Sequence, residues 1–355
     1  MSSVRKIAKE ARVSVATVSR ALNNHPEISS GTRERILKAA NEVGYFSAVG
    51  KRVTTNIGLV YTSDTTVFCE YDAVLLSGVM RGILEQRFDV TLVNLARDKG
   101  EGETYTQFFM RKGLRGVILR TLGRSRHICE AIADEGFPSV VVAERFATPN
   151  VNYICYDSQA DSRRAIEHLI NLGHKRIALA VHAISDSDHA ARREGYRQAL
   201  AAANVPVDPE LVVSVVADMD GGKSAVTRLM SLPQPPTAIY FTDPLACVGA
   251  LGRAHSIGLK IPDDLSIIGF DDGDIRFRTW PVFTAICQDA AQLGYEAALW
   301  LTRMLAGIIH EPLRKEMTTS FEVHETTGLP APQMVRVLPN GTRVPVAAGT
   351  TTLGG

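Results

Sequence analysis

The sequence lacks the long apolar runs that mark membrane proteins and secretory signals. No stretch of its 355 residues approaches the ~18 consecutive apolar residues that a membrane-spanning helix needs. The N-terminal segment carries charged residues from Arg5 onward and has no apolar core of the kind found in signal peptides. We therefore expect a cytoplasmic protein that has no membrane partner.

Cysteine is scarce and follows no spacing pattern. The chain has an odd number of cysteines and no Cys-x-x-Cys pair. Such spacing is typical of reduced thiols inside a cytosolic protein core, rather than of disulfides or a zinc site. The five are Cys69, Cys129, Cys155, Cys247 and Cys287.

Motifs of catalysis and of cofactor binding are also missing. Gly222-Lys223-Ser224 resembles the end of a phosphate-binding loop, but Ala217 stands where that loop requires a glycine. The histidine pairs lack the spacing of metal ligands on one helix face. No Gly-x-Ser-x-Gly nucleophile motif occurs. These absences predict a protein without a metal, without a cofactor and without enzyme activity.

What the chain does have is an uneven distribution of charge. Through residue 52 it contains ten Lys and Arg against four Glu, a charge of +6, so the rest must carry −5 to give the total of +1. A basic head on an acidic body is typical of a nucleic-acid-binding protein with a separate sensing domain. The length of 355 residues is enough for two or three domains.

Residues 13–23 fit a short helix with two unlike faces. Ser14 is a good N-cap, because its hydroxyl can accept a hydrogen bond from a free amide of the first turn. One face can pack on neighbouring helices and holds Thr17, Val18, Ala21 and Leu22. The other face is slim and holds Val15, Ala16, Ser19, Arg20 and Asn23. It suits a major groove, where an arginine can donate two hydrogen bonds to guanine, although a plain surface helix fits equally well.

The flanking residues favour the DNA-binding interpretation. A helix is expected on each side of it, and each has an apolar stripe. The stripe of the preceding helix is made of Val4, Ile7, Ala8 and Ala11. The stripe of the following helix is made of Ile36, Leu37, Ala40 and Val43. Ser29 can cap the third helix, and Gly44 stands where a left-handed C-cap belongs. Three short helices with a tight turn near Arg12 predict a helix-turn-helix domain.

Three runs carry a more specific signal: Val-Ser-Val-Ala-Thr-Val-Ser-Arg-x-Leu-Asn from residue 13, Ile-Ser-x-x-Thr-Arg-x-x-Ile from residue 28, and Val-Gly-Tyr from residue 43. This head resembles that of the lactose/galactose repressor family of bacterial transcriptional regulators. The resemblance implies that Val15, Ala16 and Arg20 read bases. It also implies that Thr17, Ser19 and Asn23 contact phosphates or the wall of the groove. The capping residue Ser14 completes the expected DNA-binding set.

The sequence departs from the family in two places. The linker over residues 47–56 lacks the Pro-Asn pair and the leucine that the family uses to wedge a base step open, although Lys51 and Arg52 remain to hold phosphates or a narrow minor groove. Arg12 stands where the family has a turn glycine. If that position needs a positive φ, arginine costs roughly 1–2 kcal/mol more than glycine there.

From residue 57 onward, β-rich runs alternate with helical stretches. The runs are 57–61, 90–94, 116–119 and 139–143, and the same rhythm restarts at 176–181, 211–216, 238–241 and 265–270. Continuous apolar strands that alternate with helices predict an α/β protein with doubly wound parallel sheets. Two such halves predict two lobes with a cleft between them, where ligands sit at the strand C-termini.

The expected domains are therefore an all-α helix-turn-helix head over 1–46, a linker over 47–56 and a two-lobed core over 57–329. The last segment, 330–355, is rich in Gly, Pro and Thr and shows no periodicity, so we expect it to be disordered. The core also resembles periplasmic sugar-binding proteins, through motifs such as Arg192-x-x-Gly-Tyr196 and the run from Ile261 to Asp272.

The resemblance, together with positions at the C-terminal ends of predicted strands, predicts six effector-binding residues. They are Tyr71, Glu144, Arg192, Asp243, Asp271 and Gln288. Carboxylates beside an arginine and an amide suit neighbouring hydroxyls, so the expected ligand is a sugar, a sugar acid or a polyol. Asp272 is expected to cap or turn the chain, and Asp243 fits an N-cap as well as a ligand contact. Trp280 fits either a sugar-stacking residue or a core residue.

We therefore expect a transcriptional regulator, most simply a repressor, whose grip on double-stranded operator DNA depends on a small sugar-like effector. A homodimer is expected, with a tetramer left open. Two alternatives remain at this point. One is a solute-binding protein of a sugar transporter, and the other is a carbohydrate-active enzyme that uses Glu144 and Asp271 as an acid/base pair.

Overall fold

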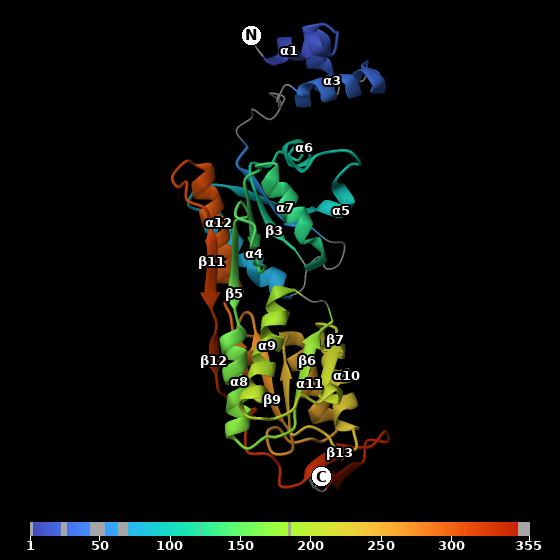
Figure 1. Cartoon of the computed structure of the whole chain (residues 1–355), viewed down its shortest axis with the longest axis vertical. Coiled ribbons are helices and arrows are strands. Elements are labelled where there is room, and N and C mark those ends of the chain that lie inside the picture. Colours follow the sequence, from blue (N-terminus) through green and yellow to red (C-terminus); the bar gives the residue numbers. More distant parts are fainter. Residues whose placement is uncertain are drawn as a thin grey trace.

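The computed structural model describes residues 3–22, 27–42, 54–62, 70–121, 123–183 and 186–346. Three bodies follow one another along the long axis of the molecule, a small helical head and two α/β lobes (Figure 1). We refer to them as the head, the N-lobe and the C-lobe. The N-lobe is the one next to the head.

The head consists of the three predicted helices, α1 (Ser3–Glu10), α2 (Val15–Leu22) and α3 (Ser30–Glu42). Their apolar faces meet in a small core that includes Ile7, Val18 and Ile36, each fully buried. The Ser14 hydroxyl accepts a hydrogen bond from the amide of Thr17 at 3.0 Å, so the expected cap of α2 is present. The helix-turn-helix prediction is confirmed.

The turn between α1 and α2 explains the unusual Arg12. Its φ is +54°, in the left-handed region. The amide of Val13 bonds the carbonyl of Ala8 at 3.0 Å and the amide of Arg12 bonds the carbonyl of Lys9 at 3.3 Å, which is the Schellman pattern that normally ends in glycine. The chain therefore carries a non-glycine residue where the backbone favours glycine.

We expect Arg12→Gly to stabilise the head by about 1 kcal/mol, because it removes the left-handed strain at the cost of some unfolded-state entropy. Thermal unfolding of the full chain, followed by circular dichroism, should show the rise. Arg12→Ala is the matched control, since it removes the same charge and keeps the strain. An equal gain in both variants would attribute the effect to charge instead.

The N-lobe is built on a six-stranded sheet of order β11-β5-β4-β3-β1-β2, in which every neighbouring pair is parallel. Its strands are β1 (Asn56–Tyr61), β2 (Asp89–Asn94), β3 (Val117–Arg120), β4 (Ser139–Val142), β5 (Tyr153–Asp157) and β11 (Arg314–Thr318). Its helices are α4 (Glu70–Ile83), α5 (Leu95–Asp98), α6 (Tyr105–Arg111), α7 (Arg126–Asp134), preceded by the short η2 (Gly123–Ser125), and α12 (Ala290–Leu305).

The C-lobe repeats this plan with a sheet of order β12-β10-β9-β8-β6-β7, in which only β12 runs antiparallel to its neighbour. Its strands are β6 (Ile177–His182), β7 (Val212–Val215), β8 (Ala238–Phe241), β9 (Ser266–Asp271), β10 (Thr284–Cys287) and β12 (Ser320–Glu322). Its helices are α8 (Gln159–Asn171), α9 (Ser187–Ala202), α10 (Met219–Met230) and α11 (Pro244–Ser256), with the short η3 (Pro209–Leu211) and η4 (Ile275–Arg278).

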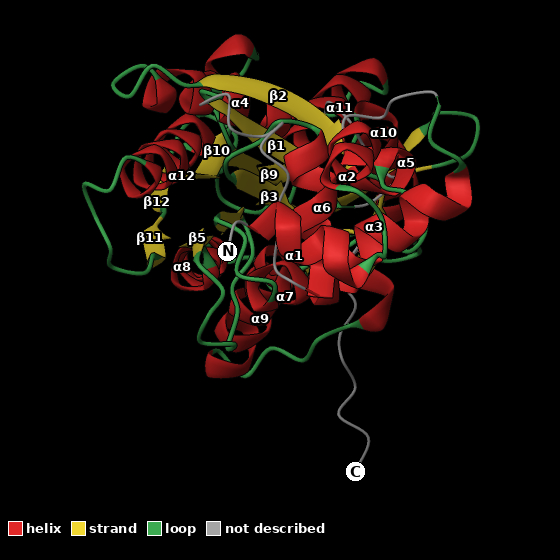
Figure 2. Cartoon of the chain, turned by 90° about the horizontal axis from the view of Figure 1, so that it is seen from above, coloured by secondary structure: helices red, strands yellow, loops and turns green. Residues whose placement is uncertain are grey.

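Each sheet is covered by helices on both faces. In the view from above, helices lie on several sides of the strands (Figure 2). On β1, Ile57 and Leu59 pack into one buried cluster with α4 and α12, whereas Val60 packs into the opposite cluster with α6. Strands buried on both faces need the continuous apolar runs seen in the sequence. The predicted α/β architecture with two doubly wound lobes is confirmed.

The chain passes between the two lobes three times, from β5 to α8, from β10 to α12 and from β11 to β12. Two of these crossings are tied together where the Tyr156 hydroxyl donates to the carbonyl of Asp289 at 3.1 Å. A few residues at the ends of strands and helices thus join the N-lobe to the C-lobe, and each lobe has its own packed core. This is the arrangement that permits hinge closure around a ligand.

The segment after residue 329 differs from the prediction of a disordered tail. Residues 334–346 form an antiparallel hairpin of β13 (Met334–Val337) and β14 (Arg343–Val346), which packs on the C-lobe. Met334 and Val337 are buried, and Arg336 donates to the carbonyl of Ser231 at 2.9 Å. The prediction was wrong over this hairpin because two apolar residues suffice to anchor it, and its polar composition hid them. Residues 347–355 lie outside the described residues.

Candidate ligand cleft and DNA-binding helix

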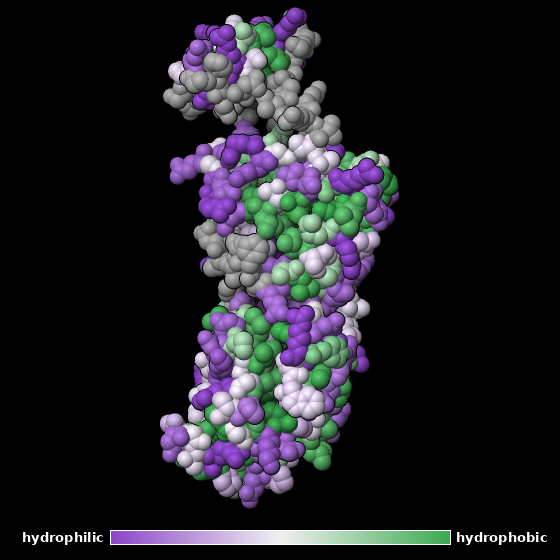
Figure 3. Space-filling model, turned by 180° about the vertical axis from the view of Figure 1, so that it is seen from behind, coloured by the Kyte–Doolittle hydropathy of each residue, from purple (hydrophilic) through white to green (hydrophobic). Residues whose placement is uncertain are grey.

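The outer face of α2 is exposed to solvent. Val15 is 46% exposed, and Ala16, Ser19 and Arg20 are exposed as well, whereas Val18 is fully buried. The Arg20 guanidinium lies 3.8 Å from the carboxylate of Glu27, an exposed ion pair that DNA can replace. Hydrophilic residues cover much of the head (Figure 3). Of the predicted DNA-binding residues, Val15, Ala16, Ser19 and Arg20 therefore share one accessible face, whereas Thr17 is half-buried. Asn23, Lys51 and Arg52 lie outside the described residues.

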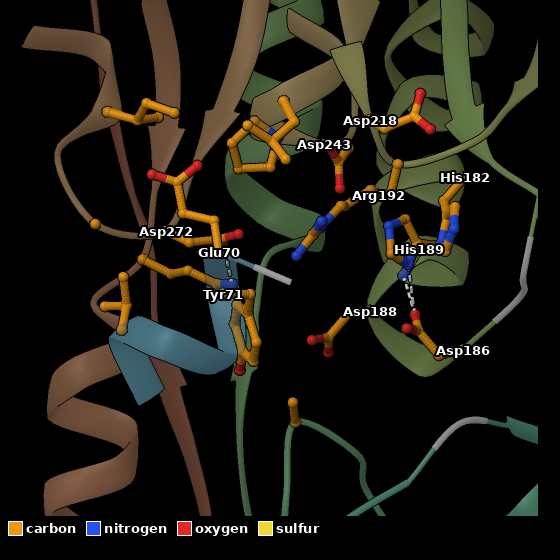
Figure 4. A pocket seen from close by; sticks show the side chains of 18 of the residues that line it. Glu70, Tyr71, His182, Asp186, Asp188, His189, Arg192, Asp218, Asp243 and Asp272 are labelled. Atoms are coloured by element: carbon orange, nitrogen blue, oxygen red, sulfur yellow. Dashed lines mark hydrogen bonds and ion pairs between the residues drawn. The ribbon is translucent and has the colours of Figure 1, made fainter. Parts of the chain in front are cut away.

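A cavity of about 420 Å³ lies between the two lobes. Its walls come from the N-terminal end of α4 and the ends of β3 and β4 in the N-lobe, and from α9, η4 and the strand ends of the C-lobe (Figure 4). This volume is within the range of small-molecule sites. Of the six predicted effector residues, four line this cavity: Tyr71, Arg192, Asp243 and Gln288.

Arg192 is the central polar residue of the cleft. Its side chain leaves α9 and points into the cavity, with only 4% of its surface exposed (Figure 4). Its NH1 group donates to the carbonyl of Thr242 at 2.7 Å, and the guanidinium stacks on the Phe270 ring at 3.4 Å. Its Nε has no partner within the described part of the chain. The stacking fixes the plane of the fork, which leaves a preorganised donor for a ligand.

The first turn of α9 supplies three cleft residues that sequence reasoning missed. Asp186 caps the helix, and both the amide and Nδ1 of His189 donate to its Oδ1, at 2.8 and 2.7 Å. Burial opposes ionisation of Asp186, but the hydrogen bonds from His189 outweigh it and lower the pKa of Asp186. Asp188 is 7% exposed, and its Oδ1 has no partner among the described residues. Burial raises the pKa of Asp188 to about 7.

Asp188 was detectable in principle. It precedes Arg192 by four residues, so the two share one face of α9. Once Arg192 is predicted to face a cleft, Asp188 is predicted to face it too.

Asp271 and Asp272 have the reverse of their predicted roles. Asp271 is fully buried, accepts hydrogen bonds from the amides of Gly273 and Ile275, each at 3.1 Å, and forms a 2.6 Å ion pair with Arg276. It caps the η4 turn and does not line the cavity. Asp272 does line it and accepts a 2.6 Å hydrogen bond from Nε2 of Gln288. Adjacent residues of an extended chain point in opposite directions, so only one of the pair can face the cleft.

Glu144 also lies outside the cavity lining. It is fully buried and pairs with Arg126 at 2.5 Å. Its second oxygen accepts a hydrogen bond from the amide of Ser187 at 3.5 Å. Glu144 therefore joins the N-lobe to the start of α9, and its neighbour Ala143 lines the cavity in its place. With neither Glu144 nor Asp271 in the lining, the enzyme alternative loses both of its proposed residues.

The remaining predicted residues have mixed roles. Tyr71 lines the cavity, and the Arg120 guanidinium lies 4.9 Å from the centre of its ring. Asp243 both lines the cavity and caps α11 by accepting from the amide of Ala246 at 3.2 Å, so its two predicted roles coexist. Trp280 is 86% exposed, so it is neither a core residue nor part of the cavity.

Among the described residues, no group of three or more His, Cys, Asp or Glu has the arrangement of a metal site. In the same part of the chain, no helix is both long and apolar enough to cross a bilayer.

Known proteins resemble this chain both in the head and in the two-lobed core. Residues 3–47 match the family described as bacterial regulatory proteins of the lacI family, and residues 166–327 match a periplasmic binding protein-like domain. The HTH-type transcriptional repressor CytR of Escherichia coli strain K12 is 31% identical over 310 residues, which cover 86% of this chain and 90% of CytR. The probable HTH-type transcriptional repressor ExuR of Bacillus subtilis strain 168 is 32% identical over 322 residues, covering 89% and 94%.

A solved structure described as a complex of the transcriptional regulator CelR with cellobiose matches the fold with a TM-score of 0.65 and 27% identity, over 91% of this chain and 99% of CelR. A helix-turn-helix head joined to a two-lobed binding domain defines a class of ligand-responsive DNA-binding regulators. This chain belongs to the lacI family of bacterial regulatory proteins, and it is a DNA-binding transcriptional regulator.

Proposed function

We propose that a small polyhydroxylated ligand, of the sugar or polyol kind, binds between the lobes and sets the affinity of the head for its operator. The observation that carries this proposal is Arg192, a buried and stacked guanidinium that points into the cavity beside Asp272 and Gln288. Planar guanidinium, carboxylate and amide groups suit neighbouring hydroxyls. The relative CelR was solved with cellobiose, which supports this ligand class.

The proposed mechanism is a change in lobe closure. A ligand that contacts both walls of the cleft favours the closed arrangement, in which the lobes turn about the three chain crossings. The N-lobe, which is next to the head, would carry that change to it. The affinity for DNA then shifts by the ligand's differential affinity for the two arrangements. The helix-turn-helix head favours such a regulator over a solute-binding protein of a transporter. We place its action in the cytoplasm, where bacterial operators are.

We further propose that the functional unit is a homodimer. Two heads would enter successive major grooves of a pseudo-palindrome, about one helical turn apart. Large apolar side chains are left exposed on both lobes, as is typical of surfaces that pack on a partner. Among the described residues these include Met80, Leu84, Leu92, Phe277 and Trp280. Sedimentation of the full chain, free and on operator DNA, tests the dimer and reveals any tetramer.

The experiment that tests the function combines two measurements. A thermal-shift screen of sugars, sugar acids and polyols identifies compounds that bind, since a ligand at 100 times its Kd adds about 2.7 kcal/mol of stability. A mobility-shift assay with operator DNA then shows whether each compound releases or strengthens DNA binding. A protein that binds its operator equally well with every stabilising compound would contradict the proposal.

Arg20→Ala should weaken binding to the specific operator by about 1–3 kcal/mol, because it removes an exposed guanidinium that reads a base. Titration of labelled operator and of random DNA measures the effect. The operator should lose more than the random DNA. Lys9→Ala, which removes an exposed charge from α1, is the control and should weaken both only slightly and equally. Equal losses from Arg20→Ala would contradict base reading.

A further inference from the structure

The polar lining of the cleft is strongly unbalanced in charge. Its acidic side chains outnumber its arginines by six to two, a formal charge of −4 when every carboxylate is ionised and the histidines are neutral. Burial raises the pKa of both Asp188 and Asp272 to about 7, so protons offset part of this charge in the empty cleft at neutral pH. The acids are Glu70, Asp186, Asp188, Asp218, Asp243 and Asp272, and the arginines are Arg120 and Arg192. Arg120 also lies 3.3 Å from the buried carboxylate of Asp72, outside the lining, so its charge is shared. The cleft is therefore short of positive charge.

The unpartnered atoms of the cleft repeat this imbalance. Within the described part of the chain, Asp188 Oδ1 and Gln288 Oε1 are buried and accept no hydrogen bond, and each side chain is only 7% exposed. Gln288 is held with its NH₂ group on Asp272, so its carbonyl oxygen is the atom left over. His189 donates from Nδ1 to Asp186, and in the neutral ring Nε2, also unpartnered, is then an acceptor.

Few donors face these acceptors. Arg192 Nε is unpartnered among the described residues, and the Tyr71 hydroxyl can either donate or accept. Burial lowers the pKa of His182, so that ring supplies no positive charge at neutral pH. Asp188 and Arg192 point into the same space opposite Tyr71 (Figure 4). A ligand that satisfies this set must bring more donors than acceptors.

An ammonium group meets that requirement, since it has three donors, no acceptor and one positive charge. A hydroxyl group adds no charge, and a carboxylate adds acceptors and repulsion. The geometry points to an effector that carries a protonated amine, seated against Asp188, beside hydroxyls held by Arg192, Asp272 and Gln288. This would be an amino sugar or an amino polyol of monosaccharide size. The inference rests on the proposed function and narrows its ligand class to sugars and polyols that carry an amine.

The test uses matched compounds on the full-length protein. Each hexose of the gluco, galacto and manno series is compared with its 2-amino, 2-acetamido and uronic acid forms, at millimolar concentration and at a pH where the amine is charged. We expect one amino sugar to raise the melting temperature most and to bind at least tenfold more tightly than its parent hexose. Its acetamido form, which keeps the nitrogen and loses the charge, should lose that advantage.

Two variants show whether Asp188 is responsible. In Asp188→Asn the preference for the amino sugar over the hexose should fall to about twofold or less, because an amide has no charge to offer. Asp220→Asn, an exposed site on α10 outside the cavity, should keep the full preference. A neutral or acidic form that binds best, or no shift with any amino compound, would overturn the inference. Failure of the proposed function is a separate result, in which operator binding ignores every compound that binds the cleft.

Discussion

Arg192→Ala should abolish the response of operator binding to the ligand while leaving operator binding itself intact. The reason is the position of Arg192, which lines the cavity from α9. The N-lobe lies between α9 and the head (Figure 1). No other arginine of the C-lobe lines the cavity among the described residues. Removing a hydrogen-bonded charged contact of this kind costs about 2–5 kcal/mol of binding, or a factor of roughly 30 to several thousand.

The measurement is a titration of the stabilising compound against the preformed protein–operator complex. Arg192→Lys is the informative second variant, because it keeps the positive charge and loses the planar fork. It should retain only a weak response. Arg193→Ala, at the exposed neighbouring position on α9, is the control and should respond as the wild type does. A normal response in Arg192→Ala would remove Arg192 from the binding site.

Much of the fold was predictable because its signals are local and periodic. The strand that begins near Ile57 is apolar along its whole length. A continuous apolar strand indicates a sheet that is covered on both faces. The cap at Ser14 and the apolar faces of the three head helices are likewise readable within one or two helical turns. The hairpin after residue 329 carries its signal in two buried side chains, Met334 and Val337, too few to stand out from a polar segment.

The site was less predictable, because its residues meet only when two lobes and several turns are in place. Arg192 could be found from its motif, since the helix that carries it is regular. The roles of Asp271 and Asp272 depend on where β9 ends and on the turn made by Arg276, which binds the first carboxylate and leaves the second for the cleft. Glu144 lies two residues after the end of β4, and Arg126 of α7 pairs with it and holds it away from the cavity.

Asp188→Asn should stabilise the ligand-free protein at pH 8 and leave its stability nearly unchanged at pH 4. The pKa of Asp188 is raised to about 7 in the folded protein, against about 3.9 in an unfolded chain. Between these values the folded state binds the proton and the unfolded state does not, so the contribution of Asp188 to stability falls as the pH rises through this window and stays lost above it. Asparagine carries no charge and removes that loss, which is of order 2–4 kcal/mol at pH 8.

Denaturant unfolding of the wild type and the variant at several pH values between 4 and 8 measures the difference. The curve of the variant minus the wild type should rise with pH and level off above about pH 7, the pKa of Asp188. Asp220→Asn is the control, because that carboxylate is exposed and its pKa is lowered by a hydrogen bond from Lys223, so its loss should bring no gain at high pH. A flat difference curve for Asp188→Asn would mean that Asp188 is already charged and compensated in the empty cleft. In that case the protein itself would neutralise the acidic excess on which the proposed preference for an amine depends. A rising curve would mean that the charge of Asp188 is uncompensated in the empty cleft, so that a ligand can neutralise it.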